Sequence, residues 1–251
     1  MSILVIGGAG ALGRAIISHC SGTLSLISYS VDFQAVLQAS HSITLPLHSS
    51  TPAASVRSHL LDALGFSAHS GGGSPCAPFR AIVCTAGGWE GGGAGEADFE
   101  SKYKKMEQAC LYPALTAAAL ACTPGVLEPS RGLLILTGSA AALKPAPGML
   151  AYYLAKASTH SLARAVGSGS GGAGGLPPGA RALCLAPHVL DTPSNRKFMA
   201  EGADTSTWTP PLCIARRVGD WVTGAQPPPA SGAIVEVVTS AGATSFKEVA
   251  L

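Results

Sequence analysis

The stretch Ile3-Leu4-Val5-Ile6-Gly7-Gly8-Ala9-Gly10-Ala11-Leu12-Gly13 decides the fold. Its first four residues are apolar without alternation, which is typical of a strand buried on both faces of a parallel sheet. Three glycines spaced three apart follow, and then a stretch of helical composition that extends to about residue 21. Glycine permits a tight turn close to a pyrophosphate, and the N–H groups that begin the next helix attract phosphate.

This order of strand, glycine turn and helix predicts a dinucleotide site. The residues expected to bind the cofactor there are Gly7, Gly10, Ala11, Leu12 and Gly13. The alternative is a glycine-rich loop without a ligand, because the chain contains 31 glycines. The position directly after the first strand favours the cofactor site.

Further apolar runs alternate with helical stretches along the chain. We expect strands at residues 24–29, 43–47, 81–85, 133–136, 182–186 and 233–238, and helices at 53–64, 97–121, 151–166 and 211–223. Pro113 is expected to kink or interrupt the second of these helices. The alternation predicts an α/β fold with a Rossmann-type, doubly wound parallel sheet, in which ligands bind at the carboxyl ends of the strands. We find no repeat, and residues 1–251 are expected to form a single domain.

Tyr152 and Lys156 are candidate catalytic residues. They are four positions apart in an expected helix, so they lie on the same face. An ammonium group beside a phenol stabilises the phenolate, which proton transfer near neutral pH requires. Ser139 follows the strand at 133–136 and would bring a hydroxyl to the same oxygen. The same spacing also occurs by chance in ordinary amphipathic helices, so this interpretation depends on the cofactor site.

Small residues follow the expected strand at 81–85. Ala86 and Gly87 would let a flat ring approach the backbone there. Trp89 comes next, and it either forms the wall of a pocket for an aromatic substrate or packs within its own loop. The residues after the strand at 182–186, including Pro187, Val189 and Thr192, end at the same edge of the sheet.

The expected second strand carries no carboxylate at its end. Residues 28–30 are Ser-Tyr-Ser, and Asp32 comes slightly later. A carboxylate at that end would bind the ribose hydroxyls of NAD, and a cation would bind the 2′-phosphate of NADP. Arg14 is only a weak substitute for such a cation. We therefore expect NADH or NADPH without choosing between them.

Composition limits the other classes of partner. The net charge of +2 gives no reason to expect a nucleic acid or an anionic membrane as partner, and no apolar run is long enough to span a bilayer. The N-terminus lacks a basic leader, and the seven cysteines follow no Cys-x-x-Cys pattern, so we expect a cytoplasmic protein with reduced thiols. The seven histidines have no metal-ligand spacing, and no metal site is expected.

These motifs occur in the order and spacing of the short-chain dehydrogenase/reductase family, which the chain resembles along almost its whole length. Longer segments resemble the quinonoid dihydropteridine reductases within that family. They are Ala-Gly-Gly-Trp-Glu-Gly-Gly at 86–92, Pro-Gly-Met at 147–149, Leu-Asp-Thr-Pro-Ser-Asn-Arg-Lys at 190–197 and Trp-Thr-Pro at 208–210.

The resemblance implies reduction of a quinonoid dihydropterin to the tetrahydropterin by a reduced nicotinamide cofactor. Tyr152 would donate the proton, and Lys156 would activate it and bind the nicotinamide ribose. The resemblance also places Ala86, Gly87, Pro187, Val189 and Thr192 at the cofactor, and Trp89, Tyr152 and Asn195 at the pterin. It further implies a homodimer formed through the helices at 97–121 and 151–166.

The chain departs from the resemblance in three places. Ser139 stands where pteridine reductases of animals carry alanine, so a carbonyl or alcohol oxidoreductase is the alternative function. The second-strand aspartate of those enzymes has no expected counterpart. The asparagine of the wider family has none either, with Gln108 or Cys110 nearby. A nucleotide-binding sensor without turnover is a third possibility, which the presence of both Tyr152 and Lys156 opposes.

Overall fold

The computed structural model describes residues 1–24, 26–32, 38–45, 53–66, 77–169, 174–199 and 202–249. A single eight-stranded sheet of order β3-β2-β1-β4-β5-β6-β7-β8 runs through the molecule. Its strands are β1 (Ser2–Ile6), β2 (Ile27–Asp32), β3 (His41–Thr44), β4 (Ala81–Cys84), β5 (Leu133–Thr137), β6 (Arg181–Pro187), β7 (Ile234–Ser240) and β8 (Ala243–Val249). Every neighbouring pair is parallel except β7 and β8. The predicted Rossmann-type α/β fold is confirmed.

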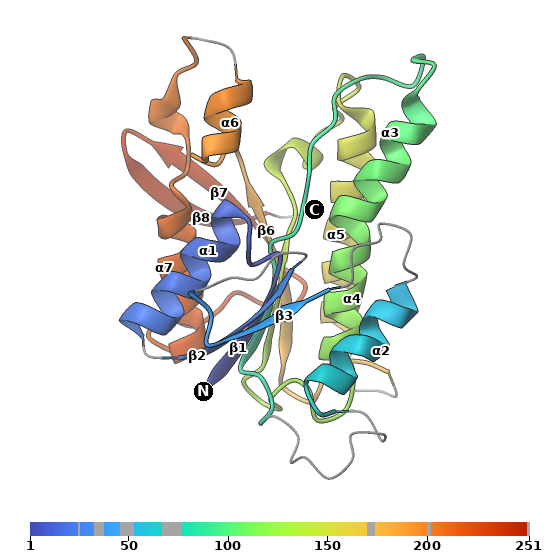
Figure 1. Ribbon diagram of the computed structural model, residues 1–251. Helices are drawn as coiled ribbons and strands as arrows, with labels where there is room; N and C mark the ends of the chain where they lie inside the picture. Colours follow the sequence, from blue (N-terminus) through green and yellow to red (C-terminus); the bar gives the residue numbers. More distant parts are fainter. Residues whose placement is uncertain are drawn as a thin grey trace.

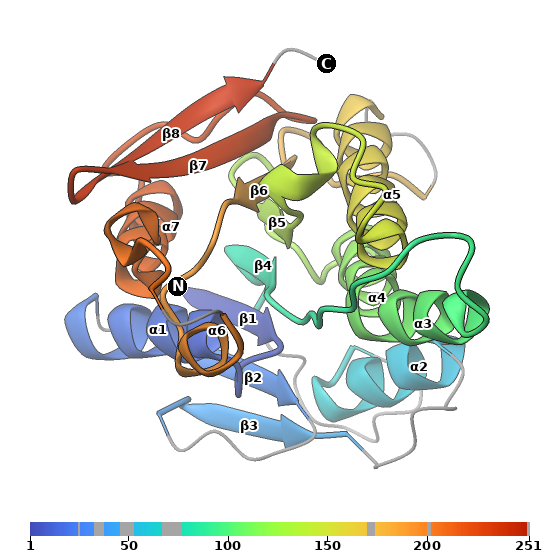
Figure 2. The same ribbon diagram turned by 90° about the horizontal axis from the view of Figure 1, so that it is seen from above.

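Helices cover both faces of the sheet (Figures 1 and 2). Helices α1 (Ala11–Ser18) and α7 (Pro211–Thr223) lie on one face, and α2 (Ala53–Ala63), α4 (Tyr112–Ala121) and α5 (Leu150–Ser168) on the other. Helix α3 (Phe99–Met106) precedes α4, and the short α6 (Pro193–Phe198) lies above the carboxyl ends of the strands. None of the described helices is long and apolar enough to cross a membrane.

The apolar character of β1 follows from this double cover. Ile3 and Val5 pack into the core under α1 and α7, whereas Leu4 and Ile6 pack into the core on the opposite face. Because successive strand residues point to opposite faces, a strand covered on both sides needs apolar residues at every position.

The second strand lies three residues later in the chain than expected. A π-helical turn, η1 (His19–Thr23), continues α1, and Leu24 follows it as a cap. The strand therefore begins at Ile27 and ends at Asp32. The third strand is also shifted, to His41–Thr44, and the end of its expected range lies outside the described residues.

The strand expected at residues 233–238 is present as β7, but it is not the last strand of the chain. Strand β7 turns through Ala241 and Gly242 into β8, which pairs with it antiparallel. Both turn residues have positive φ, 48° and 75°, as a two-residue hairpin requires. Ala-Gly lacks the asparagine or aspartate that usually indicates such a turn, so the hairpin was missed.

The expected helix at 97–121 is interrupted, as Pro113 predicted. A π-helical turn, η2 (Glu107–Leu111), separates α3 from α4, and Pro113 lies in the first turn of α4. Proline has no N–H to donate to the preceding turn, and a widened turn just before it absorbs this break.

Candidate active site

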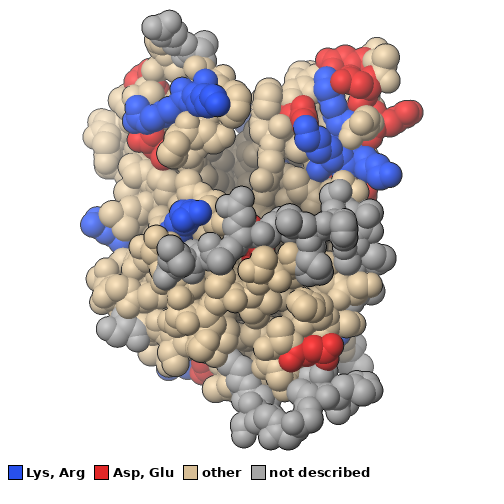
Figure 3. Space-filling model, in the orientation of Figure 1, with Lys and Arg blue, Asp and Glu red and all other residues tan. Residues whose placement is uncertain are grey.

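The site lies where the carboxyl ends of the parallel strands meet. The surface is hollowed there, between the part of the molecule that carries α6 and the part that carries α3 (Figure 3). The glycine turn after β1 opens toward this edge, and the chain after β4 runs beside it (Figure 2).

The glycine turn packs so closely on the end of β4 that side chains are excluded. Gly7 has a φ of +88°, and a Cβ on it would lie 2.4 Å from the amide nitrogen of Ala86. A Cβ on Gly13 would lie 2.3 Å from the carbonyl oxygen of Gly7. Around Gly10, by contrast, a Cβ would meet only that oxygen, at 3.4 Å, so the outer side of the turn is open. A phosphate group can therefore approach the N–H groups at the start of α1. This open approach fits the predicted dinucleotide site.

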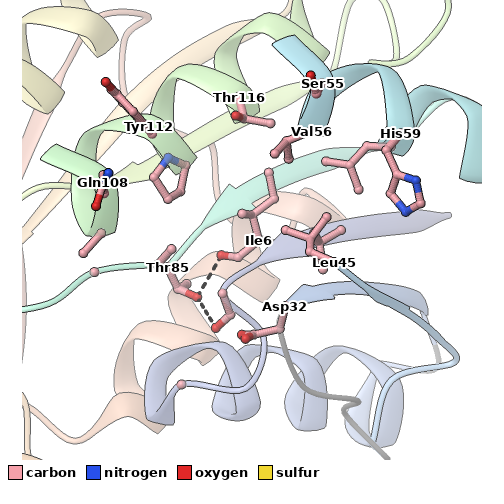
Figure 4. A pocket seen from close by; sticks show the side chains of 18 of the residues that line it. Ile6, Asp32, Leu45, Ser55, Val56, His59, Thr85, Gln108, Tyr112 and Thr116 are labelled. Atoms are coloured by element: carbon pink, nitrogen blue, oxygen red, sulfur yellow. Dashed lines mark hydrogen bonds between the residues drawn. The ribbon is translucent and has the colours of Figure 1, made fainter. Parts of the chain in front are cut away.

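Thr85 ties the ends of β1 and β4 together. Its hydroxyl lies 3.2 Å from the carbonyl oxygen of Ile6 and 3.0 Å from that of Gly7, and it donates to this pair (Figure 4). The backbone N–H of Thr85 also donates to Ile6, at 2.8 Å. Sequence reasoning missed this residue, although a threonine directly after a buried strand is a signal for such a bond.

A cavity of about 500 Å³ extends from the glycine turn along α2 and α4 (Figure 4). Its lining includes four of the predicted cofactor residues, Gly7, Gly10, Ala86 and Gly87. The predicted residues Ala11, Leu12 and Gly13 do not belong to this lining. The Leu12 side chain packs instead into the core between α1 and the sheet. The volume falls in the range of small-molecule sites.

Asp32 corrects the expectation of a second strand without a carboxylate. It is the last residue of β2, it lines the cavity, and its Oδ2 accepts a hydrogen bond of 2.8 Å from the N–H of Ala9. The nearby Arg14 donates through Nε to the carbonyl oxygen of Ala9, at 2.7 Å. A carboxylate therefore stands at the position where a dinucleotide-binding fold binds the ribose hydroxyls.

Lys156 and Tyr152 lie on one face of α5, as predicted. The ammonium of Lys156 is buried, donates to the carbonyl oxygen of Thr137 at 2.8 Å and lies 5.9 Å from the centre of the Tyr152 ring. A Cβ on Gly87 would be 3.3 Å from this ammonium, so Lys156 reaches the wall of the cavity.

The pKa of Lys156 reflects two opposing influences. Burial opposes a charge, but the neighbouring Cys110 and Tyr152 outweigh it, so the pKa of Lys156 is raised from its ordinary value. Burial also raises the pKa of Cys84 to about 11 and that of Cys184 to about 12, so both thiols are neutral at pH 7.

Ser139 does not pair with Tyr152 in the described part of the chain. It is buried, and its Oγ accepts from the N–H of Ala141, which caps the short 3₁₀ turn η3 (Ala140–Ala142). Its backbone N–H donates to Nε2 of His160, at 3.2 Å. Burial and the adjacent Lys156 lower the pKa of His160 to about 4, so its ring is a neutral acceptor. Sequence reasoning missed His160, although it lies one helical turn beyond Lys156.

Cys110 lies beside the segment that follows β4. The N–H of Gly88 donates to its Sγ at 3.4 Å, and the thiol is almost fully buried. The π-helical turn η2 carries this residue, whereas Gln108 of the same turn lines the cavity. The structure thus distinguishes the two candidates for the missing asparagine, because Cys110 contacts Gly88 and Gln108 lines the cavity.

The remaining predicted residues lie around α6 and in the loop after β4. Pro187 ends β6, Val189 accepts a backbone bond from Thr209 at 2.8 Å, and Thr192 caps α6 by accepting from the N–H of Asn195 at 3.1 Å. The Asn195 amide donates to the carbonyl oxygen of Leu190 at 2.8 Å, so it holds its own loop. Trp89 is 65% exposed.

A sequence comparison identifies a relative that spans almost the whole chain. No protein-family model matches the sequence. A dihydropteridine reductase from Dictyostelium discoideum is 33% identical over 245 residues, which cover 98% of this chain and 97% of that protein.

Solved structures show the same fold at low identity. A short-chain dehydrogenase from Salmonella enterica serovar Typhi superposes with a TM-score of 0.72 at 16% identity, covering 94% of each chain. BdcA, crystallised in complex with NADPH, superposes with a TM-score of 0.67 at 18% identity, covering 94% of this chain and 91% of that one. The chain therefore belongs to the short-chain dehydrogenase/reductase family of oxidoreductases, and within it to the dihydropteridine reductases.

Proposed function

We propose that this protein reduces a quinonoid dihydropterin to the tetrahydropterin with a reduced nicotinamide cofactor. The observation that carries the proposal is the end-to-end match to a dihydropteridine reductase, which spans 98% of this chain. The geometry of the site supports it, because the buried ammonium of Lys156 lies beside the Tyr152 ring and close to Gly87, which lines the cavity.

The residues of this chain would hold the cofactor as follows. The backbone of Gly7, Gly10 and Gly13 and the start of α1 would bind the pyrophosphate. Ala86 and Gly87 would flank the ribose, and Val189 and Thr192 the nicotinamide side. When bound, the reduced nicotinamide supplies a hydride.

Tyr152 would supply the proton that accompanies the hydride. Its phenol would donate to a ring nitrogen of the pterin, directly or through one water. The buried ammonium of Lys156 would stabilise the phenolate left behind, because a nearby opposite charge favours the ionised form. Thr137 would hold Lys156 in place through the 2.8 Å bond from its ammonium to the carbonyl oxygen.

Trp89 is proposed to cover the pterin ring. Its indole is 65% exposed, so its apolar surface is open to a flat ligand. Asn195 is proposed to act near the same ligand, with its amide oriented by the bond to Leu190.

Asp32 makes NADH the proposed cofactor. A carboxylate at the end of β2 accepts hydrogen bonds from the adenosine ribose and repels the 2′-phosphate of NADPH. The bond from Ala9 fixes its orientation toward the glycine turn.

The test is a spectrophotometric assay with freshly generated quinonoid dihydropterin, run in parallel with NADH and NADPH. We expect rapid oxidation of NADH and slower oxidation of NADPH. Tight cofactor binding without oxidation of either would contradict pterin reduction.

Carbonyl reduction by the same site is the second candidate, because of Ser139. Its Oγ accepts from Ala141, which leaves the hydroxyl proton for donation to a substrate carbonyl oxygen. The substitution Ser139→Ala separates the two functions. Pterin reduction should persist in this variant, whereas a carbonyl reductase should lose most of its turnover.

A further inference from the structure

Three arginines lie at the amino ends of neighbouring strands, at the opposite edge of the sheet from the active site. Arg80 directly precedes β4, Arg131 lies two residues before β5, and Arg181 begins β6. These three strands are adjacent and parallel, with Leu133 paired with Ala81 on one side and with Arg181 on the other. The register therefore brings the three side chains to one place.

Arg80 is buried without enough hydrogen-bond partners. It is 4% exposed, and its Nη2 donates to the carbonyl oxygen of Trp221 at 3.3 Å. Its Nε and Nη1 have no partner within the described part of the chain. A buried guanidinium with two unpaired donor groups is costly unless a ligand or water completes it.

The unpaired groups belong to a side chain that lines a cavity. The cavity has a volume of about 280 Å³, and Arg131 and Arg181 line it as well. Glycines form part of its wall, at positions 132, 179 and 224. This volume lies just below the usual range for drug-sized ligands, so a compact ligand fits it.

The charges around the cavity favour an anion. Burial and the neighbouring Arg131 lower the pKa of the Arg80 guanidinium, and Glu128 opposes this only in part. Arg181 donates to the carbonyl oxygens of Pro228 and Pro229, at 2.9 and 3.2 Å, which holds its guanidinium at the rim. Like charges brought together in this way repel one another, and an oxyanion between them would remove that cost.

We propose that this cavity binds a compact phosphate-type oxyanion, with Arg80 as its buried ligand and Arg131 and Arg181 as the outer ones. The planar guanidinium donates two parallel hydrogen bonds to such an anion, and its unpaired Nε and Nη1 are the donors available for them. The proposal is independent of the reaction proposed above, because the site lies at the other edge of the sheet.

Calorimetric titration with inorganic phosphate tests the proposal. Saturating NADH is present throughout, so that the glycine turn is occupied and does not take up the probe. We expect one saturable site in the wild-type protein. Arg80→Met and Arg131→Gln should each weaken phosphate binding by at least about ten-fold, since each removes a charged donor. Arg131 is exposed, so its substitution does not endanger folding.

Arg216→Gln is the matched control. This arginine lies on α7, is exposed and does not line the cavity. It removes one positive charge from the helix that carries Trp221, and phosphate binding should remain within about two-fold of wild type. Absence of saturable binding in the wild type would overturn the proposal, as would equal loss in Arg216→Gln and Arg131→Gln.

A second titration, with adenosine 5′-monophosphate under the same conditions, separates a phosphate ester from the free ion. Tighter binding of the nucleotide would identify an ester as the ligand, and weaker binding would identify the free ion. Either result supports the site only if Arg131→Gln weakens the binding of the ligand that binds more tightly. Equal binding of that ligand to this variant and to the wild type would overturn the proposal.

Discussion

Two requirements on Lys156 conflict, namely its burial and its positive charge. It is buried, which opposes its charge, yet the proposed proton transfer from Tyr152 needs an ammonium beside that residue. The carbonyl oxygen of Thr137 resolves part of this conflict by accepting from Nζ. Two residues further along the chain, the N–H of Ser139 donates to Nε2 of His160, which also lies on α5. One donor and one acceptor on a single helix face thus fix the end of β5.

Removal of the Tyr152 hydroxyl tests the proposed acid. Tyr152→Phe should lower kcat for pterin reduction by roughly 10²-fold or more, because proton transfer from a positioned group contributes about that much. NADH affinity, measured by quenching of protein fluorescence, should change little, since the ring and Lys156 remain. Unchanged turnover would show that another group donates the proton.

His160 predicts a pH dependence of stability. Burial and Lys156 lower its folded pKa to about 4, so the unfolded chain, with an ordinary pKa near 6.5, takes up a proton first as the pH falls. The stability from this group is therefore complete above pH 6.5 and is lost as the pH falls toward 4, by about 3 kcal/mol. The Cys184 thiol near Gly138 is neutral in this range, because burial raises its pKa to about 12.

His160→Gln keeps an acceptor for Ser139 but does not titrate. Urea unfolding at pH 7 and pH 4.5 should show a smaller loss of unfolding free energy in this variant than in wild type. An equal loss in both proteins would mean that His160 is not the titrating group.

At the scale of elements, the sequence predicted the strand–turn–helix units better than their boundaries. The glycine turn and the Tyr152–Lys156 helix were located correctly because periodicity and spacing are local properties. Strand β2 was placed three residues early because a π-helical turn occupies residues 19–23, and no propensity distinguishes that turn from an α-helix. The same shift hid Asp32 at the end of the strand. The contact between His160 and Ser139 depends on tertiary packing, which sequence spacing does not reveal.

The end of β2 gives a prediction about cofactor choice. Asp32→Asn removes the negative charge but keeps an oxygen to accept from Ala9. We expect the ratio of kcat/KM for NADPH to that for NADH to rise by about ten-fold or more, because repulsion of the 2′-phosphate is lost. Parallel steady-state assays with both cofactors measure this ratio. If it is unchanged, Asp32 does not select the cofactor.

The turn between β1 and α1 gives a prediction about packing. Gly7→Ala places a methyl group 2.4 Å from the backbone of Ala86 in a residue whose φ is +88°. The unfolding free energy should fall by at least about 2 kcal/mol, and NADH binding should be lost. Thermal unfolding and fluorescence titration measure both effects.

Gly22→Ala is the matched control for this substitution. A Cβ at Gly22 would have no atom within 4 Å, and the residue lies in the π-helical turn η1. This change should be neutral or stabilise the protein by up to about 1 kcal/mol, because alanine favours helical backbone. Equal destabilisation by both substitutions would show that the loss is not caused by contact with Ala86.

At the scale of the whole molecule, helices α4 and α5 each carry a large apolar side chain that is partly exposed. Leu115 on α4 and Leu154 on α5 are 39% and 37% exposed. Small residues accompany them on both helices, and such surfaces permit helices of two copies to approach closely. The homodimer that the family resemblance implies stays a prediction, and these side chains offer a way to test it.

Sedimentation velocity over a range of concentrations tests this dimer. Leu115→Glu should weaken association by at least about hundred-fold, because an isologous interface buries the new charge twice. Leu212→Glu is the control, since Leu212 is 45% exposed on α7, which covers the other face of the sheet. That variant should sediment as wild type does. The prediction is contradicted if the wild type sediments as a monomer at every concentration. It is also contradicted if both substitutions cause equal dissociation.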